Sequence, residues 1–184
     1  MFVLRDEGFF VPQKCVGQQT KEREMSYIDY RFAQKDDVDA IVALIQEHGD
    51  NNVLAERRET ILAVVNAGLM LVCIDGKKIV GCQGVRLWPQ PNALEFGPKV
   101  VRRDYRGQTI GTNLSAMILE HCKTSFPNTR LFAFASGDSK GIWRRLGLVE
   151  ARDVPSEMFG ACATCSKWSR EQGVCCALIL EYVG

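Results

Sequence analysis

The sequence has no long apolar run and almost no net charge. No stretch reaches the roughly 18 apolar residues that cross a bilayer, and Arg5, Asp6 and Glu7 stand where a secretory signal needs an apolar core. The chain carries 23 basic and 22 acidic residues, for a formal net charge of +1. A balanced charge favours neither nucleic acid nor an anionic membrane surface as a partner. These absences predict a cytoplasmic protein that binds no nucleic acid and no membrane.

Internal repeats and low-complexity tracts are also missing. With 184 residues, 46% of them apolar, the chain has the length and composition of one soluble domain with a full core. Residues 1–24 mix aromatic and polar side chains without a sustained period, which predicts a loosely ordered N-terminal extension. The domain itself is expected to span residues 25–184. The oligomeric state is left open, a homodimer included.

Apolar periodicity predicts strands alternating with helices, and therefore an α/β (α+β) fold. The Asp75-Gly76 pair supplies turn chemistry for a hairpin between two of the strands. Helices are expected from residue 36 to about residue 48 and over 55–66, 111–123 and 139–146. Strands are expected over 27–32, 69–74, 78–87, 93–101, 130–135, 148–152 and 175–183.

Residues 100–115, VVRRDYRGQTIGTNLS, form the segment most indicative of a binding site. A β-branched run enters a basic turn with two glycines and continues into an apolar helix. Glycines let the backbone approach an anion closely, and the N-terminus of the following helix presents the positive end of its dipole. Arg102, Arg103 and Arg106 add positive charge. The segment predicts a phosphate-binding loop, the alternative being an ordinary strand-turn-helix connection.

This segment resembles the acyl-CoA-binding motif of the GNAT N-acyltransferase superfamily, whose common form is Arg-Gly-x-Gly-Ile-Gly. Thr109 replaces the middle glycine, and because threonine tolerates positive φ poorly, a shifted loop or weaker pyrophosphate binding is expected. The resemblance implies that acyl-CoA is the co-substrate. It assigns the pyrophosphate to Arg106, Gly107, Gln108, Thr109, Ile110, Gly111 and Thr112.

The resemblance also implies a fold. It extends over residues 27–183 and implies a mixed, largely antiparallel sheet of about seven strands, splayed after strand four, with helices on both faces. Main-chain groups near the end of strand four, at Lys99 and Val101, would pair with the pantetheine arm. One of their N–H groups would polarise the thioester.

Glu95 is the candidate base for removing the proton of the attacking amine. A lysine-type amine has a pKa of about 10.4, so a base must act on it directly or through water. Glu95 precedes Arg106 by eleven residues, the spacing at which the histone-acetyltransferase branch of the family carries its strand-four glutamate. On an alternating strand, Leu94 and Phe96 face the other way. The alternative is a surface carboxylate paired with a nearby arginine.

The segment SGDSKGIWRRLGL, residues 136–148, resembles another family motif, in which a tyrosine acts as general acid toward the thiolate. Trp143 stands at the tyrosine position, Ser136 at an asparagine position and Leu148 at a phenylalanine position. An indole N–H does not titrate as an acid. The sequence therefore leaves the general acid unassigned.

The chain has eight cysteines, and four of them cluster near the C-terminus in a predicted insertion at about residues 160–176. A C-x-x-C pair is a known metal-binding spacing, and a second pair would complete a structural zinc site. Adjacent cysteines on one strand point to opposite faces, which argues against four ligands. Zinc, a labile disulfide and free thiols all remain open. The cluster consists of Cys162, Cys165, Cys175 and Cys176.

Together these features predict an N-acetyltransferase that moves an acetyl or short acyl group from acyl-CoA to a primary amine by direct attack. A non-catalytic acyl-CoA sensor or interaction module is the alternative, because Thr109 and Trp143 depart from the family pattern. A redox- or metal-responsive adaptor that uses the cysteine cluster ranks last. The acceptor, a small molecule or a protein, is not encoded in any motif.

Overall fold

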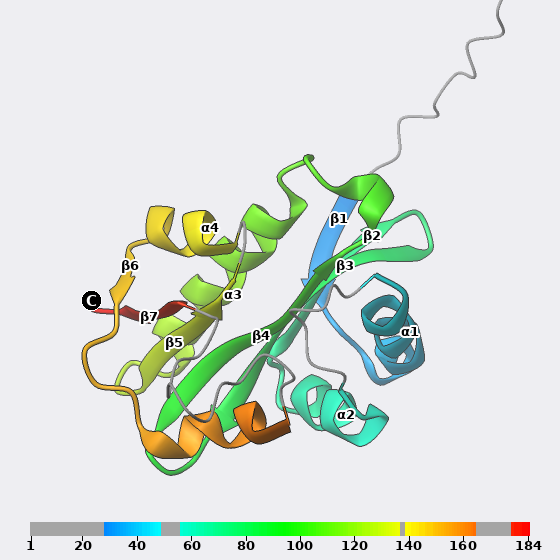
Figure 1. Ribbon diagram of the computed structural model, residues 1–184. Helices are drawn as coiled ribbons and strands as arrows, with labels where there is room; N and C mark the ends of the chain where they lie inside the picture. The colour runs from blue at the N-terminus through cyan, green and yellow to red at the C-terminus, as the bar shows by residue number, and fades with distance from the viewer. Residues whose placement is uncertain (1–27, 49–55, 137–138, 165–177) are drawn as a thin grey trace, which may run out of the picture.

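A seven-stranded mixed sheet forms the centre of the molecule (Figure 1). The computed structural model describes residues 28–48, 56–136, 139–164 and 178–184. The strand order is β1-β2-β3-β4-β5-β7-β6, and every neighbouring pair is antiparallel except β4 and β5. The strands are β1 (Ile28–Phe32), β2 (Met70–Asp75), β3 (Lys78–Trp88), β4 (Ala93–Val101), β5 (Arg130–Ala135), β6 (Leu148–Glu150) and β7 (Leu178–Tyr182).

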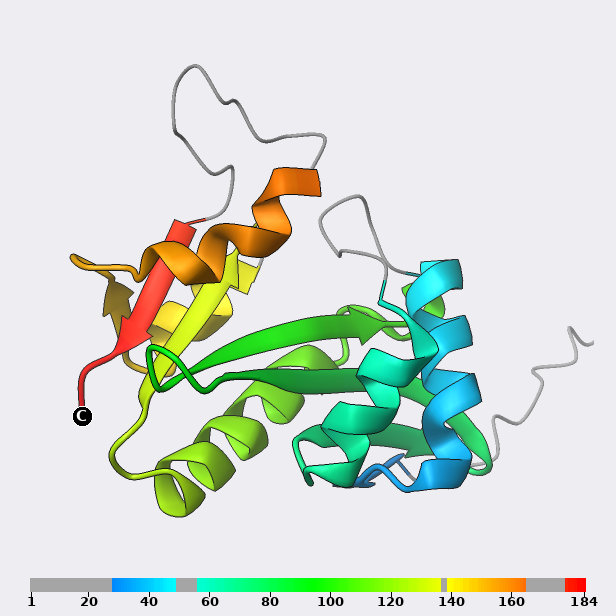
Figure 2. The same cartoon turned by 90° about the horizontal axis from the view of Figure 1, so that it is seen from below.

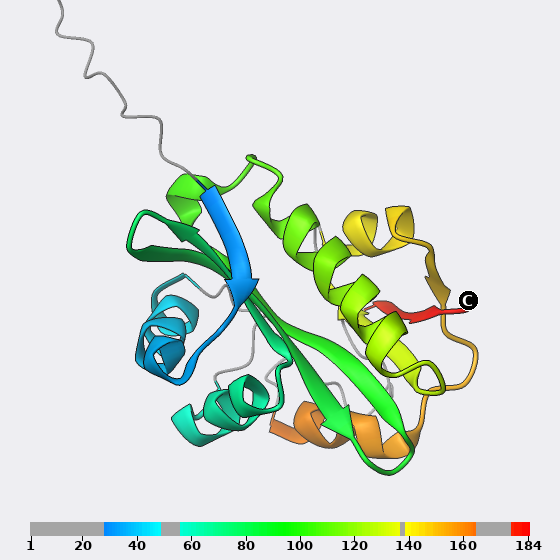
Figure 3. The ribbon, with the colours of Figure 1, turned by 180° about the vertical axis from the view of Figure 1, so that it is seen from behind.

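Helices cover both faces of the sheet, as Figures 2 and 3 show. One face carries α3 (Ile110–Ser125) and α4 (Ser139–Arg145), and the other carries α1 (Val38–His48) and α2 (Arg58–Asn66). The 3₁₀ segment η3 (Ser156–Thr164) lies on the α1 and α2 side. Two further 3₁₀ turns are η1 (Lys35–Asp37), before α1, and η2 (Arg103–Tyr105), between β4 and α3.

The two faces bury separate apolar clusters. The stripe of α3 that includes Leu114 and Ile118 packs against β4, β5 and α4 residues in one cluster. Ile41 of α1 and Ile61 of α2 are fully buried in the other, together with Val100 of β4. Among the helices that the structure describes, none is long and apolar enough to span a membrane.

The predicted fold class and sheet are confirmed, and the ranges expected for β4 and β5 are the observed ones. Other boundaries differ by one to three residues. The α2 helix begins at Arg58 rather than residue 55, β6 ends at Glu150 rather than residue 152, and η3 was not predicted. The short η3 segment buries Met158 against Phe132. Anchoring by isolated side chains such as Met158 gives no helical period in the sequence.

Candidate functional site: the open edge of β4 and the loop that follows

A β-bulge interrupts the pairing of β4 with β3. Gln83 lies opposite Lys99, whereas Val85 lies opposite Phe96, so one β3 residue faces two residues of β4. That β3 residue is Gly84, where a Cβ atom would come within 3.1 Å of the carbonyl oxygen of the bulge residue Gly97. Glycine therefore allows the close approach of the two backbones at the bulge.

The strand β4 separates from β5 where the bulge begins. The parallel pairing of the two strands extends only from Ala93 to Glu95, while β5 continues to Ala135 alongside β7. Within the described residues, the edge of β4 that faces away from β3 has no partner strand after Glu95. The splay predicted from the family resemblance is thus present, and it exposes main-chain groups on the strand that contains Lys99 and Val101.

The open edge leads directly into the predicted phosphate-binding loop. After β4, the chain makes the η2 turn, and Gly107 takes a left-handed φ of 79° before α3 begins. The first turn of α3 contains no acidic residue, and its N-cap Thr109 makes no side-chain capping bond. The first N–H groups of a helix have no intrahelical partner. This end of α3 is therefore suited electrostatically to an anion.

Arg106 holds the loop against the end of α1. Its Nε donates to the carbonyl oxygen of Val101 at 3.1 Å, and its Nη2 donates to the carbonyl oxygen of His48 at 2.9 Å. The C-terminal carbonyls of a helix attract cations, so the second contact also suits the dipole of α1. The guanidinium thus connects the loop to the end of β4 and to the C-terminus of α1.

Thr109 adopts the left-handed conformation that glycine would take, with φ 62° and ψ −1°. The threonine therefore keeps the left-handed turn and carries strain in its backbone. A left-handed conformation costs a residue with a side chain about 1–2 kcal/mol, whereas a glycine costs about 0.4–1 kcal/mol through the unfolded chain. We therefore expect Thr109→Gly to raise the free energy of unfolding by about 1 kcal/mol in urea denaturation.

The matched control for this prediction is Thr112→Gly, in the first turn of the same helix. Thr112 has no left-handed strain to relieve, so glycine there is expected to lower the stability by about 0.5 kcal/mol. A Thr109→Gly protein no more stable than the Thr112→Gly protein would contradict the assignment of strain to Thr109.

The side chain of Lys99, which sequence reasoning did not consider, lies partly buried on the α3 side of β4. Its Nζ donates to Ser115 Oγ at 3.2 Å, and Ser115 Oγ lies 3.4 Å from Gln83 Oε1. Ser115 and Gln83 are fully buried. Nζ also lies 5.1 Å from the centre of the Trp143 ring. Burial lowers the pKa of Lys99 from its ordinary value of 10.5 to about 8.

The lowered pKa of Lys99 predicts how the free energy of unfolding changes with pH. Between pH 8 and 10.5 the folded protein has released the Lys99 proton while the unfolded chain still binds it, so the contribution of Lys99 to stability rises with pH. Below pH 8 the partly desolvated ammonium is unfavourable. We expect Lys99→Met to stabilise the protein at pH 7 by about 2–3 kcal/mol in urea denaturation, and the difference to shrink toward pH 10. Lys78→Met, at an exposed position of β3, should show no such trend.

Glu95 lies on the opposite face from Lys99 and is held by two donors. Its Oε2 accepts from Arg86 Nη1 at 3.1 Å and from Trp88 Nε1 at 3.0 Å. Arg86 also donates to Glu56 Oε1 at 2.5 Å, immediately before α2. The arginine pairing that formed the alternative interpretation of Glu95 is therefore present. The carboxylate is held in a fixed position on the α2 side of β4.

Trp143 is a core residue. It is 3% exposed and stacks on Phe96 with ring centroids 4.6 Å apart. Both rings belong to the cluster on the α3 and α4 face. The indole thus packs beside the part of β4 that leaves β5, and Gly147, with φ 91°, ends the helix that presents it.

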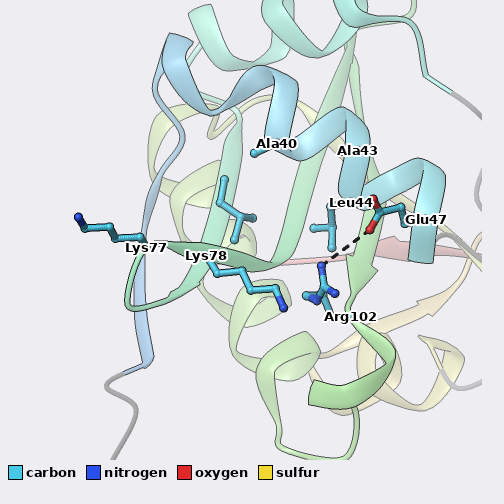
Figure 4. Close-up of a pocket in the computed structure, with 8 residues that line it drawn as sticks. Ala40, Ala43, Leu44, Glu47, Lys77, Lys78 and Arg102 are labelled. Carbon is cyan, nitrogen blue, oxygen red and sulfur yellow. Dashed lines mark ion pairs between the residues drawn. The ribbon is translucent and has the colours of Figure 1, made fainter.

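A shallow depression of about 470 Å³ lies on the opposite side of the sheet, between α1 and the β2–β3 turn (Figure 4). Arg102 Nη1 and Glu47 Oε2, 3.9 Å apart, form an ion pair beside it. Lys78 points toward Arg102, whereas Lys77 points away. Of the segment predicted to bind phosphate, residues 100–115, only Arg102 lines this depression.

The cysteine cluster lies outside the described residues, except that the backbone of Cys162 forms part of η3. Zinc, disulfide and free thiols there remain predictions. Within the part of the chain that the structure describes, no group of three or more His, Cys, Asp or Glu side chains is placed to hold a metal ion. Cys73, Cys82 and Cys122 are buried free thiols.

Comparison with known proteins agrees with this geometry. The family model described as acetyltransferase (GNAT) family matches residues 24–147, more than half of the chain. The chain belongs to the GNAT acetyltransferase family. No curated protein sequence matches it closely enough to count as a relative.

Solved GNAT-like structures share its fold at low identity. Rv2747 from Mycobacterium tuberculosis, solved with CoA, is 19% identical, with a TM-score of 0.64 over 84% of this chain and 98% of that one. N-acetylglutamate synthase from Neisseria gonorrhoeae, complexed with coenzyme A and N-acetyl-glutamate, is 18% identical, with a TM-score of 0.65. The match covers 85% of this chain and 35% of that one. Diaminobutyrate acetyltransferase from Paenibacillus lautus is 16% identical, with a TM-score of 0.53. The match covers 66% of this chain and 72% of that one.

Proposed function

We propose that this GNAT protein transfers an acetyl or other short acyl group from acyl-CoA to a primary amine by direct attack. The observation that carries the proposal is the open edge of β4, which leads through the loop at residues 102–109 to the N-terminus of α3. An extended, thioester-bearing arm fits along an unpaired strand edge, because main-chain N–H and C=O groups there are available for hydrogen bonding. In this proposal Lys99 and Val101 contribute those groups.

The diphosphate of acyl-CoA would then bind at the loop from Arg106 to Thr112. Gly107 gives the close backbone approach, and the N–H groups of Ile110, Gly111 and Thr112 at the start of α3 donate to the anion. Gln108 and Thr109 complete the turn. The side chain of Arg106 contributes mainly by fixing the loop to α1, as its contacts with two carbonyl oxygens indicate.

The acceptor amine would approach from the face that carries Glu95. Glu95 would take the ammonium proton, directly or through water, and Arg86 and Trp88 would hold its carboxylate in position. The related structures with amino-acid ligands, N-acetyl-glutamate in one and L-2,4-diaminobutyric acid in another, support an amino acid as acceptor. We therefore propose an amino-acid amine as the first acceptor class to test.

The experiment is a transfer assay with the wild-type chain. Acetyl-CoA is incubated with a panel of amino acids and diamines, CoA thiol release is followed spectroscopically, and the acetylated product is identified by mass spectrometry. The proposal expects amine-dependent thiol release and an acetylated product. Saturable acetyl-CoA binding without turnover on any amine would favour the alternative, a non-catalytic acyl-CoA sensor.

A further inference from the structure

The side chain of Lys99 is a partly buried cation whose neighbours on the α3 and α4 side are neutral groups. Gln83 faces it from β3, Ser115 from α3 and the Trp143 ring from α4. No carboxylate of the described residues forms an ion pair with it. Even partial removal of an unpaired ammonium from water is unfavourable. A structural lysine would gain from a carboxylate partner, so this arrangement calls for another explanation.

The position of Lys99 supplies one. It lies on the part of β4 that has left β5, four residues beyond the last pair at Glu95 and two before the strand ends at Val101. Under the proposed function, the thioester lies along this same segment. Glu95 and Lys99 are on opposite faces of β4, so one group faces the acceptor side and the other faces the α3 and α4 side.

We propose that the Lys99 ammonium donates a proton to the thiolate of CoA as the thioester breaks. This inference rests on the proposed function. The amine nitrogen forms a bond to the thioester carbon, the C–S bond breaks and its electron pair passes to sulfur. A proton moves from Lys99 Nζ to that sulfur, which leaves CoA thiol and a neutral lysine. Glu95 or water removes the proton of the attacking nitrogen, and Lys99 regains its proton from solvent after CoA leaves.

The chemistry of the neighbouring groups favours Lys99 for this step. The indole of Trp143 does not titrate, and the hydroxyl of Ser115 and the amide of Gln83 are far weaker acids than an ammonium. Burial lowers the pKa of Lys99 to about 8. A thiol has a pKa of about 8.5, so proton transfer between the two is nearly balanced, as efficient general acid catalysis requires. Ser115, through its hydrogen bond to Nζ, is the positioning residue.

The test compares two acyl donors that differ only in the leaving atom, acetyl-CoA and the acetyl ester of selenocoenzyme A. A selenolate is a much weaker base than a thiolate and departs without a proton. We expect Lys99→Met to lower kcat about 100-fold with acetyl-CoA, and the defect to fall to within a few-fold with the selenoester. Lys99→Arg keeps the charge, but its guanidinium does not release a proton, so it should show the same pattern.

Equal defects with both donors would overturn the proposal, since they would mean that Lys99 polarises the carbonyl or only supports the fold. Unchanged kcat in both variants would also overturn it. Melting temperature and the Kd of CoA are measured for each variant, and Lys99→Arg provides a second test if Lys99→Met does not fold. A wild-type protein that acetylates no amine would instead contradict the proposed function, which keeps the two failures distinct.

Discussion

Replacing Glu95 with glutamine is expected to lower kcat for acetyl transfer about 100-fold or more while leaving the Kd of acetyl-CoA unchanged. The amide cannot take a proton from the acceptor, but its carbonyl oxygen can still accept from Arg86 Nη1 and Trp88 Nε1. The geometry around position 95 should therefore survive. Steady-state kinetics and calorimetric titration with acetyl-CoA measure the two quantities separately.

The matched control is Glu56→Gln. Glu56 binds the same guanidinium as Glu95, so this variant removes the other carboxylate of the ion pair and keeps the candidate base. Its loss of kcat should be much smaller than that of Glu95→Gln. Equal losses in the two variants would show that the arginine pair matters only for structure, and that Glu95 is a paired surface carboxylate rather than the base.

Replacing Trp143 with alanine is expected to destabilise the protein by about 3–5 kcal/mol, the range for removing a buried large aromatic side chain. Trp143 is 3% exposed and stacks on Phe96, so truncation leaves a cavity between α4 and β4. For a chain of this size the change corresponds to a fall in Tm of about 6–20 °C. Urea and thermal denaturation give the two numbers independently.

Trp143→Phe is the control, because it keeps an aromatic face for Phe96 and for the Lys99 ammonium. It should cost about 1 kcal/mol. A loss below about 1 kcal/mol for the alanine variant would mean that the ring contributes little packing, and that the account of Trp143 as a core residue is wrong.

Much of the fold follows from local patterns. The ranges of β4 and β5 are readable from β-branched and apolar runs bounded by turn residues, and the Asp75-Gly76 turn joins β2 to β3 as expected. Gly76 takes a φ of 60° there. Short segments that pack through a few side chains are harder to predict. The η3 segment is an example, since burial of Met158 against β5 leaves no repeating signal in the sequence.

The candidate site likewise has one part that the sequence predicts and one part that it does not. Its loop is visible in the sequence because glycines and arginines are required locally, and Thr109 takes the left-handed conformation of the glycine it replaces. The surroundings of Lys99 depend on contacts across β3, α3 and α4, which no spacing along the chain encodes. One feature of the sequence pointed to these surroundings. Lys99 stands two residues before the end of a mostly apolar strand, where a long charged side chain either extends to solvent or packs among its neighbours.

The claim on which both proposals depend is that the open edge of β4 and the loop before α3 hold acyl-CoA. The most direct test is the melting temperature of the wild-type chain with and without saturating acetyl-CoA. A ligand at about 100 times its Kd adds about 2.7 kcal/mol to the folded state, so we predict a rise of several degrees, and an equal rise for Glu95→Gln. An unchanged melting temperature at millimolar acetyl-CoA would contradict the account, because a GNAT fold that does not bind the donor cannot transfer its acyl group.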